Sequence, residues 1–323
     1  MIDDSHNPLV GRDLLRLLDL TPDEFGLILE RALADKAAWR CGQHDQSQQG
    51  KAVAVIMEKP SLRTRVSFEV GAERLGAHAV VLADDHSAFS RGETIKDTVK
   101  VLERFVDCIV LRTFAQAKVE EVAKWAQIPV INALTDDFHP CQGLTDFMCI
   151  YEHKAVAGEP VLSALAKLKI AYLGDGNNMA HTYLEAAALA GASCAVATPE
   201  DFGPDPKIVA ECQALAARTG ATLSVGCDPA YALSGADVVL TDTWTSMGQE
   251  GEHDQRIAPF AGFQIDAAKM ALASSDAIFM HCLPAHRGEE VVGQVIDGDQ
   301  SVIYDEAEDR LHSEKTLMNL LMG

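Results

Sequence analysis

The chain has 323 residues, 48% of them hydrophobic, and a formal net charge of −21. This length exceeds one typical domain and predicts two, while the lack of any run of about 18 uncharged apolar residues argues against a membrane span. The acidic balance argues against nucleic acid as a partner, because that affinity depends on Lys and Arg neutralising phosphates.

The predicted elements begin with a helix over residues 20–39, where Thr21, Pro22 and Glu24 supply an N-cap, a first-turn proline and the acid of a capping box. Apolar strand segments follow, separated by helical patterns: KAVAVIM, HAVVLA, DCIVLR and IPVINAL. Beyond a helical segment at residues 141–157 come LKIAYLGD, SCAVATP, ATLSVG, ADVVLTD and DAIFMHC, and then a last amphipathic helix. The alternation predicts an α/β protein with two parallel-sheet βαβ lobes and a cleft between them.

The N-terminus and the cysteines both indicate a cytoplasmic protein. The opening segment MIDDSHNPLVGRD lacks the basic flank and the apolar core of a secretory signal. The eight cysteines are scattered, mostly within apolar stretches, and none forms a C-x-x-C pair. This pattern is typical of buried thiols in a reducing compartment and argues against disulfides and structural zinc.

Polar motifs stand directly after predicted strands. In open parallel sheets, ligands bind at the carboxyl ends of the strands, where loops lead into helices whose first N–H groups point outward. The motifs are EKPSLRTR, LRTF, HPCQ, GDGNN, DTWTSMGQE and HCLPAHRGEE. We therefore expect the functional residues to gather at these sheet edges.

The first of these motifs predicts a phosphate site. Ser61 is a natural N-cap, and Arg63, Thr64 and Arg65 occupy the first helical turn. Free N–H groups, the helix dipole and guanidinium forks can hold one dianion together, each charge-assisted bond contributing roughly 1.5–3 kcal/mol. The alternative is an exposed basic first turn, which is less favourable because arginine at a helix N-terminus needs a compensating anion.

The motifs together give a resemblance that covers essentially the whole chain. SLRTRVSFE, LRTF, FHPCQ, DTWTSMGQE and FMHCLPAHRGEEV resemble those of the carbamoyltransferases, and D-x-x-x-S-M-G and H-C-L-P resemble the ornithine branch of that family. The resemblance implies transfer of a carbamoyl group from carbamoyl phosphate to the δ-amino group of L-ornithine, giving L-citrulline and phosphate without metal or cofactor. It also implies a homotrimer or a multiple of trimers.

The same resemblance implies how the chain is divided. Residues 1–147 would form a carbamoyl phosphate-binding domain and residues 148–304 an ornithine-binding domain. Residues 305–323 would form a C-terminal helix that packs back on the first domain. The active site would lie in the cleft between the two lobes.

The reaction needs groups that hold the leaving phosphate and polarise the carbonyl oxygen. The residues that the resemblance assigns to carbamoyl phosphate are Ser61, Leu62, Arg63, Thr64, Arg112, His139, Gln142, Cys282, Leu283 and Arg310. Among them, Arg112 would reach both the phosphate and the carbonyl oxygen, and His139 would donate to that oxygen. Gln142, on the same helical face as His139, would accept from the carbamoyl NH2.

The amino-acid substrate needs acceptors for its ammonium groups and donors for its carboxylate. The residues that the resemblance assigns to ornithine are Asn178, Asp242, Ser246 and Met247. The sulfur of Cys282 and the carbonyl of Leu283 would lie beside the δ-nitrogen. The implied catalytic residues are Arg112, His139, Asp242 and Cys282.

Cys282 also suggests a covalent nucleophile, because His281 precedes it and His286 follows within one short loop. Adjacent residues on an extended strand point to opposite faces, so His281 is poorly placed as its base. We therefore favour a sulfur near Asp242, with thiolate character, that orients the amine and helps to deprotonate it.

Other functions remain as alternatives. LGDGNNMAHTYLEAAALAG follows a strand and opens a helix, as a dinucleotide-binding loop does, but Met179 stands where the third glycine is needed. An oxidoreductase is therefore a weak alternative. A carbamoyltransferase for a related amine such as N-acetylornithine or putrescine, or a non-catalytic relative, is a closer one.

Two positions depart from the family pattern. Leu62 stands where relatives commonly have Thr, and Ala88 stands where they commonly have Gln, in a loop that reaches a neighbouring subunit's phosphate site. Ser87, Ser90 or Arg91 could replace the donor that Ala88 lacks. The sequence leaves open whether the reaction serves arginine biosynthesis or runs backward in the arginine deiminase pathway.

Overall fold

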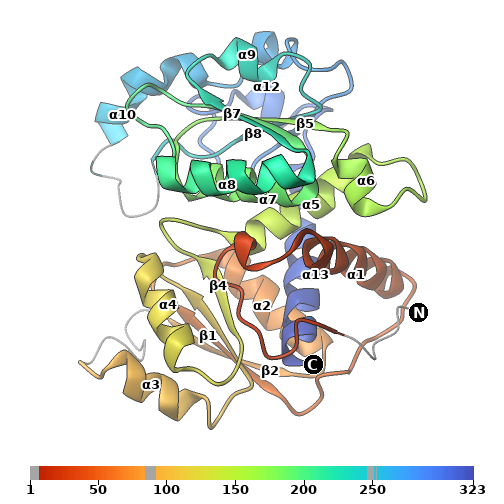
Figure 1. Ribbon diagram of the computed structural model, residues 1–323, viewed down its shortest axis with the longest axis vertical. Coiled ribbons are helices and arrows are strands. Elements are labelled where there is room, and N and C mark those ends of the chain that lie inside the picture. Colours follow the sequence, from red (N-terminus) through yellow and green to blue (C-terminus); the bar gives the residue numbers. More distant parts are fainter. Residues whose placement is uncertain (1–6, 84–91, 246–250, 252) are drawn as a thin grey trace. The chain divides into compact units, whose positions relative to one another are not determined.

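The computed structural model describes residues 7–83, 92–245, 251 and 253–323. The chain forms two compact units, one of Met1–Met148 with Glu308–Gly323 and one of Cys149–Ala307. Each unit is built on a parallel sheet with helices between successive strands (Figure 1). This confirms the predicted α/β class with two parallel-sheet lobes.

The first unit contains a parallel sheet in the order β2-β1-β3-β4. Its strands are β1 (Ala52–Met57), β2 (His78–Ala83), β3 (Cys108–Arg112) and β4 (Val130–Leu134). Its helices are α1 (Pro22–Arg40), which follows a short 3-10 helix at Leu17–Asp19, α2 (Leu62–Arg74), α3 (Ile95–Leu102) and α4 (Gln116–Trp125). Helices α5 (Pro140–Lys154) and α13 (Ile303–Met322) each belong partly to this unit.

The first helix begins as its sequence predicts. The Oγ1 atom of Thr21 accepts from the Glu24 N–H at 3.3 Å, and the Glu24 carboxylate accepts from the Thr21 N–H at 2.8 Å. These reciprocal bonds satisfy two helix-terminal donors, and Pro22 occupies the first helical position where no N–H is needed.

Strands β1 and β3 of the first sheet are buried on both faces. Val53, Val55 and Val110 point to one face and Ile56 and Ile109 to the other, and all are inaccessible to solvent. One face is covered by α3 and α4, whose contributing residues are Val99, Val119 and Val122. This two-sided burial explains why the strands are continuous apolar runs rather than alternating ones.

The second unit contains a parallel sheet in the order β7-β6-β5-β8-β9. Its strands are β5 (Lys169–Leu173), β6 (Ser193–Ala197), β7 (Thr222–Gly226), β8 (Val238–Thr241) and β9 (Ile278–Met280). Its helices are α6 (Val161–Leu165), α7 (Asn178–Ala190), α8 (Pro206–Thr219), α9 (Pro229–Leu233), α10 (His253–Phe260), α11 (Ala267–Met270) and α12 (Gly293–Ile296), with a 3-10 helix at Ala261–Phe263.

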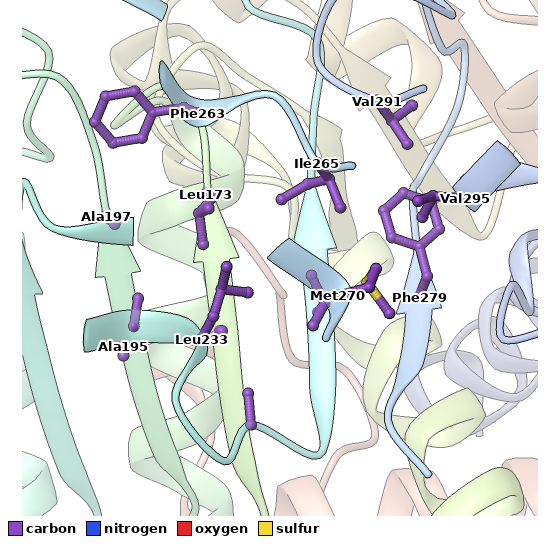
Figure 2. Close-up of a cluster of buried hydrophobic side chains, with 14 of the residues drawn as sticks. Leu173, Ala195, Ala197, Leu233, Phe263, Ile265, Met270, Phe279, Val291 and Val295 are labelled. Carbon is purple, nitrogen blue, oxygen red and sulfur yellow. The ribbon is translucent and has the colours of Figure 1, made fainter. Parts of the chain in front are cut away.

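A cluster of buried apolar side chains fixes the second sheet against its short helices. Figure 2 shows Leu173 of β5 and Phe279 of β9 beside Ile265, Met270 and Val295. Phe279 and Ile265 are fully buried. Burial of each side chain of this size contributes about 1.5–3 kcal/mol to the free energy of folding. The cluster therefore stabilises the ends of β5, β8 and β9 from which the carboxyl-terminal loops begin.

In both sheets the first strand along the chain lies in the middle. Strand β1 lies between β2 and β3, and β5 lies between β6 and β8. From such a strand the chain continues to a neighbour on one side, and a later strand lies on its other side. The loops that leave these two adjacent strands run in opposite directions, and open α/β sheets bind ligands in the crevice between such loops. Functional residues are therefore expected in the loops after β1 and β3 in the first unit and after β5 and β8 in the second.

Within the described part of the chain, no helix combines the length and the apolar content needed to cross a bilayer.

Candidate active site

The turn after β1 presents the N-terminus of α2. The Oγ atom of Ser61 accepts from the Thr64 N–H at 3.2 Å, which makes Ser61 the N-cap. Leu62 begins the helix with 75% of its surface exposed, Arg63 is half-buried and Thr64 is fully buried. The first N–H groups of a helix have no intrahelical acceptors, so this end can bind an anion.

The two arginines of this turn have different surroundings. Arg65 is exposed, and its Nε atom lies 3.4 Å from the Oε1 atom of Glu69, one turn further along α2. Arg63 lies close enough to His139 to lower the pKa of that imidazole. Arg63 therefore belongs to a polar cluster in the first unit, whereas Arg65 forms a surface ion pair.

Arg112 and His139 extend this cluster from neighbouring strands. Arg112 is the last residue of β3, pairs in register with Met57 of β1, and is 5% exposed. His139 directly precedes α5 and is 4% exposed. The adjacency of β1 and β3 thus brings Arg112 to the turn that holds Ser61 and Arg63.

The surroundings of His139 keep it neutral. Burial lowers the pKa of His139 well below its ordinary value of 6.5, and the positive charges of Arg310, Arg112 and Arg63 lower it further. A neutral imidazole retains one N–H donor and carries no charge that would repel the arginines.

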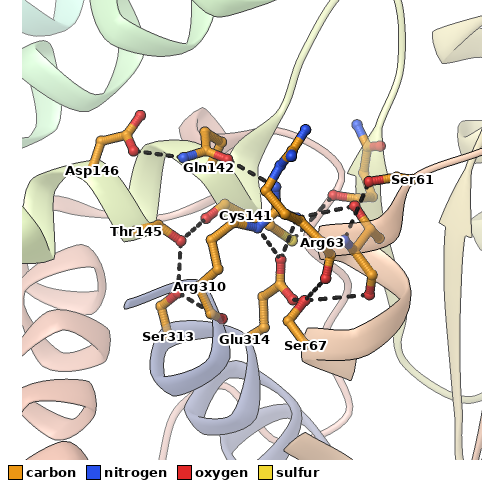
Figure 3. Close-up of polar contacts among 12 residues, drawn as sticks. Ser61, Arg63, Ser67, Cys141, Gln142, Thr145, Asp146, Arg310, Ser313 and Glu314 are labelled. Carbon is orange, nitrogen blue, oxygen red and sulfur yellow. Dashed lines mark hydrogen bonds and ion pairs between the residues drawn. The ribbon is translucent and has the colours of Figure 1, made fainter. Parts of the chain in front are cut away.

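Arg310 of α13 connects the turn of α2 to α5 (Figure 3). Its Nη2 atom lies 3.1 Å from the Oγ1 atom of Thr64, and its Nη1 atom lies 2.9 Å from the Oε1 atom of Gln142. The Nε2 atom of Gln142 donates to Asp146 at 2.7 Å. Because a carboxylate only accepts, Asp146 fixes the amide orientation of Gln142 and leaves its oxygen on the side of Arg310.

The first unit therefore brings together seven of the residues expected to bind carbamoyl phosphate. They are Ser61, Arg63, Thr64, Arg112, His139, Gln142 and Arg310. Three of the seven are arginines, so this cluster is positive in a chain whose formal net charge is −21. An anionic ligand is thus attracted locally although the protein as a whole repels it.

In the second unit, Asp242 lies at the centre of a polar group at the carboxyl ends of β5, β8 and β9. It follows β8 and is 9% exposed. Its Oδ1 atom accepts from the Thr243 N–H at 2.8 Å and from the thiol of Cys282 at 3.4 Å. Its Oδ2 atom accepts from the side-chain amide of Asn177 at 3.2 Å. Buried polar groups are normally hydrogen-bonded, and these three bonds hold Asp242 in one orientation.

Asn177 is a residue that the sequence analysis did not single out. It caps α7, where its Oδ1 atom accepts from the N–H groups of Met179 and Ala180 at 2.9 and 3.4 Å. The same side chain donates to Asp242, so Asn177 links the start of α7 to the end of β8. Asn178, which was expected to contact ornithine, is the first residue of α7 and is largely buried.

Arg256 is a second residue that the sequence analysis missed. Its Nη1 atom lies 2.6 Å from the Asp175 carboxylate and 2.9 Å from the carbonyl oxygen of Trp244. Burial raises the pKa of Asp175 above its ordinary value, and Arg256 acts against this shift while the charge of Asp242 adds to it. Arg256 thus supports the loops after β5 and β8 next to Asp242.

Cys282 and His281 follow β9 but have separate roles. The Nδ1 atom of His281 accepts from the Leu283 N–H at 2.9 Å, and its Nε2 atom lies 3.2 Å from the Oε1 atom of Glu290. Both ring nitrogens are engaged in a fully buried side chain, which argues against His281 as a base for Cys282. Among the described residues other than glycine, Leu283 alone has a positive φ, at 58°, a conformation that is concentrated at functional sites.

A metal could be considered where Asp242, His281 and Cys282 meet. Each offers one potential ligand atom, and these atoms lie within 4.8 Å of one another. An ion held by His281 would have to displace either the Leu283 N–H or the contact with Glu290. The hydrogen bonds account for this group, and we assign no metal to it.

The glycine-rich loop after β5 is shaped by packing. A Cβ atom on Gly176 would lie 2.3 Å from the backbone of Gly203 and Pro204, and the Gly176 N–H donates to the Phe202 carbonyl at 2.8 Å. Another loop therefore occupies the space that a dinucleotide phosphate would need beside this glycine. This finding argues against the oxidoreductase alternative.

Some expected site residues lie outside the described residues. These are Ser246 and Met247 of the D-x-x-x-S-M-G motif and the loop residues Ser87, Ala88, Ser90 and Arg91. Their expected roles stay predictions.

The chain matches family models in both halves. Residues 12–152 match the carbamoyl-P binding domain of aspartate/ornithine carbamoyltransferase, and residues 166–321 match its Asp/Orn binding domain. The chain therefore belongs to the aspartate/ornithine carbamoyltransferase family, as its motifs predicted. The family models cover the two halves in which the clusters around Arg63 and Asp242 occur.

Relatives over nearly the full length are ornithine carbamoyltransferases. That of Symbiobacterium thermophilum is 48% identical over 315 residues, covering 98% of this chain and 99% of its own. That of Pyrococcus horikoshii is 46% identical over 315 residues, covering 98% of this chain and 97% of its own.

The solved ornithine carbamoyltransferase from Pyrococcus furiosus has a TM-score of 0.92 at 45% identity, with 98% of both chains covered. The crystal structure of that from Gloeobacter violaceus has a TM-score of 0.84 at 43% identity, covering 96% of this chain and 98% of its own.

Proposed function

We propose that this protein is an ornithine carbamoyltransferase that transfers the carbamoyl group of carbamoyl phosphate to the δ-amino group of L-ornithine, giving L-citrulline and phosphate. The observation that carries the proposal is the cluster of Arg63, Arg112 and Arg310 around a neutral His139 at the N-terminus of α2. Such a cluster suits a dianion that gains charge as it leaves. The match to ornithine carbamoyltransferases over 98% of the chain supports the choice of substrates.

The first step is binding of the phosphate by the turn at Ser61 to Thr64. The N–H groups at this end of α2 and the guanidinium groups of Arg63 and Arg112 are the donors. When the carbon–oxygen bond to phosphate breaks, its electron pair stays on the phosphate oxygen. The arginines stabilise the added charge, which lowers the barrier to that step.

The carbonyl oxygen becomes negative while the amine attacks the carbonyl carbon. His139 is proposed as the donor to this oxygen, because its imidazole is neutral and has an N–H to give. The oxygen of Gln142 is proposed as the acceptor for the carbamoyl NH2, because Asp146 holds the amide nitrogen on the opposite side. These two bonds fix the plane of the carbamoyl group for attack.

The amine must arrive without a proton and loses a second one as the new carbon–nitrogen bond forms. The leaving phosphate can take that second proton, so the atoms balance without a further reactant. Asn178 and Asp242, with Ser246 and Met247, are proposed to hold the α-amino and α-carboxylate groups. Cys282 is proposed to orient the δ-nitrogen.

Purified protein assayed with carbamoyl phosphate and each of L-ornithine, N-acetylornithine and putrescine tests this function. We expect citrulline from ornithine at a kcat/KM well above the other two amines. Product from N-acetylornithine or putrescine instead would move the protein to another branch of the family. Absence of product from all three amines would indicate a non-catalytic relative.

The proposed assembly is a homotrimer or a multiple of it. Large apolar side chains are exposed in the first unit: Leu62 at 75% and Val66 at 46%, one turn apart on α2, and Phe105 at 72% after α3. Exposed apolar side chains grouped on a helix face are typical of an interface. Sedimentation or mass photometry of the purified protein tests the assembly.

A cytoplasmic location is part of the same proposal. All eight cysteines fall within the described residues as free thiols, and free thiols suit a reducing compartment. The direction of the reaction, toward arginine biosynthesis or toward catabolism through citrulline cleavage, depends on the concentrations of its substrates in the cell. Comparing the forward rate with phosphorolysis of citrulline would distinguish these uses.

A further inference from the structure

Glu314 lies one helical turn after Arg310 on α13 and is 1% exposed. Its Oε1 atom accepts from the Nε atom of Arg310 at 3.1 Å and from the Nη2 atom at 2.7 Å. Its Oε2 atom accepts from the hydroxyl of Ser67. Figure 3 shows this carboxylate between the guanidinium group and α2.

Ser67 ties the carboxylate to the phosphate turn. It lies on α2 one turn after Arg63, and its Oγ atom is 2.7 Å from the Arg63 carbonyl oxygen. Glu314 therefore contacts, through two oxygens, both the arginine of α13 and the helix whose first turn is proposed to hold phosphate.

We propose that Glu314 is a positioning residue for the carbamoyl phosphate site: it holds the guanidinium plane of Arg310 so that Nη2 reaches Thr64 and Nη1 reaches Gln142. This proposal rests on the proposed function, because it gives Arg310 its purpose there.

The geometry of the guanidinium group is the reason for this role. Arginine donates in fixed directions within one plane, so a carboxylate that takes the Nε edge also determines where the Nη1 and Nη2 hydrogens point. In this structure those directions lead to Thr64 at 3.1 Å and to Gln142 at 2.9 Å. Without Glu314 the long side chain has other rotamers, and its charge would be drawn toward any bound anion.

The charge balance supports the same role. Arg310 and Glu314 form a buried ion pair at 2.7 Å, so together they add no net charge to the site. Arg63 and Arg112 then carry the positive charge that faces the phosphate, while Arg310 acts as an oriented donor. Burial raises the pKa of the Glu314 carboxyl, and Arg310 and Ser67 act against this shift, so the carboxylate depends on the same partners that it positions.

Two variants of Glu314 separate position from charge. Glu314→Gln keeps the shape: its oxygen can accept from Arg310 and its amide nitrogen can donate to Ser67. Glu314→Asp keeps the charge but is one methylene shorter, so it cannot reach Arg310 and Ser67 at once. We expect kcat/KM for carbamoyl phosphate to stay within about fivefold of wild type in Glu314→Gln. In Glu314→Asp we expect it to fall on the order of 10²-fold, mostly through kcat.

The matched control is Asp309→Asn, on the neighbouring residue of α13. Asp309 forms a buried ion pair with Lys36 of α1, so this variant also disturbs a buried carboxylate of the same helix. We expect it to lower Tm while leaving kcat and both KM values unchanged. Melting curves for all four proteins ensure that rates refer to folded enzyme.

Wild-type kinetics in Glu314→Asp, or equal kcat losses in Glu314→Asp and Asp309→Asn, would overturn the positioning role. Higher activity in Glu314→Asp than in Glu314→Gln would assign the effect to charge and would overturn the positioning role as well. If the wild type itself makes no citrulline, the proposed function fails first. In that case calorimetry with inorganic phosphate still tests positioning: we expect weaker phosphate binding in Glu314→Asp than in Glu314→Gln, and equal binding contradicts the role.

Discussion

The thiol of Cys282 donates a hydrogen bond to Asp242, with 3.4 Å between Sγ and Oδ1. This bond ties the sulfur to a carboxylate that is itself fixed by Thr243 and Asn177. The contact agrees in position with the sulfur expected near Asp242, and the protonation of that sulfur stays a prediction. Because Asp242 holds the sulfur and both ring nitrogens of His281 are engaged, Cys282 is better placed to orient an amine than to attack a carbonyl carbon.

Replacing Cys282 by Ser tests this role. The hydroxyl can make the same bond to Asp242, so we expect residual turnover, about 10–100-fold below wild type, with a shifted pH profile. Steady-state citrulline assays over a pH series give the profile, and Cys227→Ser, at an exposed cysteine, is the control. Detection of a carbamoyl thioester on Cys282 by mass spectrometry during turnover would establish a covalent nucleophile instead.

Arg63 is expected to make the largest contribution to phosphate binding. Arg63→Ala removes a charge-assisted contact to a group that gains charge as it leaves, so kcat/KM for carbamoyl phosphate should fall by roughly 2–4 kcal/mol, or on the order of 10²–10³-fold. The control is Arg65→Ala in the same helical turn, where the arginine is exposed and paired with Glu69. Equal kinetics in both variants would remove the phosphate site from this turn.

The fold could be predicted from the sequence because its signals are local. The central strands of each sheet are buried, so they are continuous apolar runs, and each predicted strand segment contains an observed strand, from Ala52–Met57 to Ile278–Met280. The strand order could not be read in this way. It depends on the side to which each crossover returns, which no single segment encodes.

The site residues that the sequence analysis missed depend on contacts between distant segments. Glu314 stands four positions after Arg310, a visible helical pair, but its bond to Ser67 of α2 exists only in the folded chain. Asn177 had a local signal, since asparagine before a helix is a favoured N-cap, yet its bond to Asp242 joins α7 to β8. Arg256 reaches Asp175 from α10 in the same way.

Asn177 is expected to influence ornithine binding through Asp242. Asn177→Ala removes the cap of α7, at a cost of about 1 kcal/mol in stability, and also one donor to the Asp242 carboxylate. We expect KM for ornithine to rise about tenfold, with a smaller change for carbamoyl phosphate. Asp205→Ala removes the cap of α8 and serves as the control for stability alone. A rise in KM for ornithine of the same size in Asp205→Ala would show that Asn177 acts only as a cap.

His312 should make the stability of the protein depend on pH. Its side chain is 2% exposed, and burial, together with the charge of Lys36, lowers its pKa from 6.5 to about 4 although Glu308 acts in the opposite direction. Below pH 6.5 His312 therefore becomes protonated in the unfolded chain, whereas in the native protein it stays neutral until about pH 4. The contribution of neutral His312 to the free energy of unfolding is thus fully present above about pH 6.5. It is lost as the pH falls toward 4, by at most about 3 kcal/mol.

Urea unfolding of wild type and His312→Gln at pH 7, 5.5 and 4.5 measures this loss, with His78→Gln, at an exposed histidine, as the control. We expect the free energy of unfolding of the wild type to fall more steeply than that of His312→Gln; parallel curves would mean that His312 takes up its proton equally in both states.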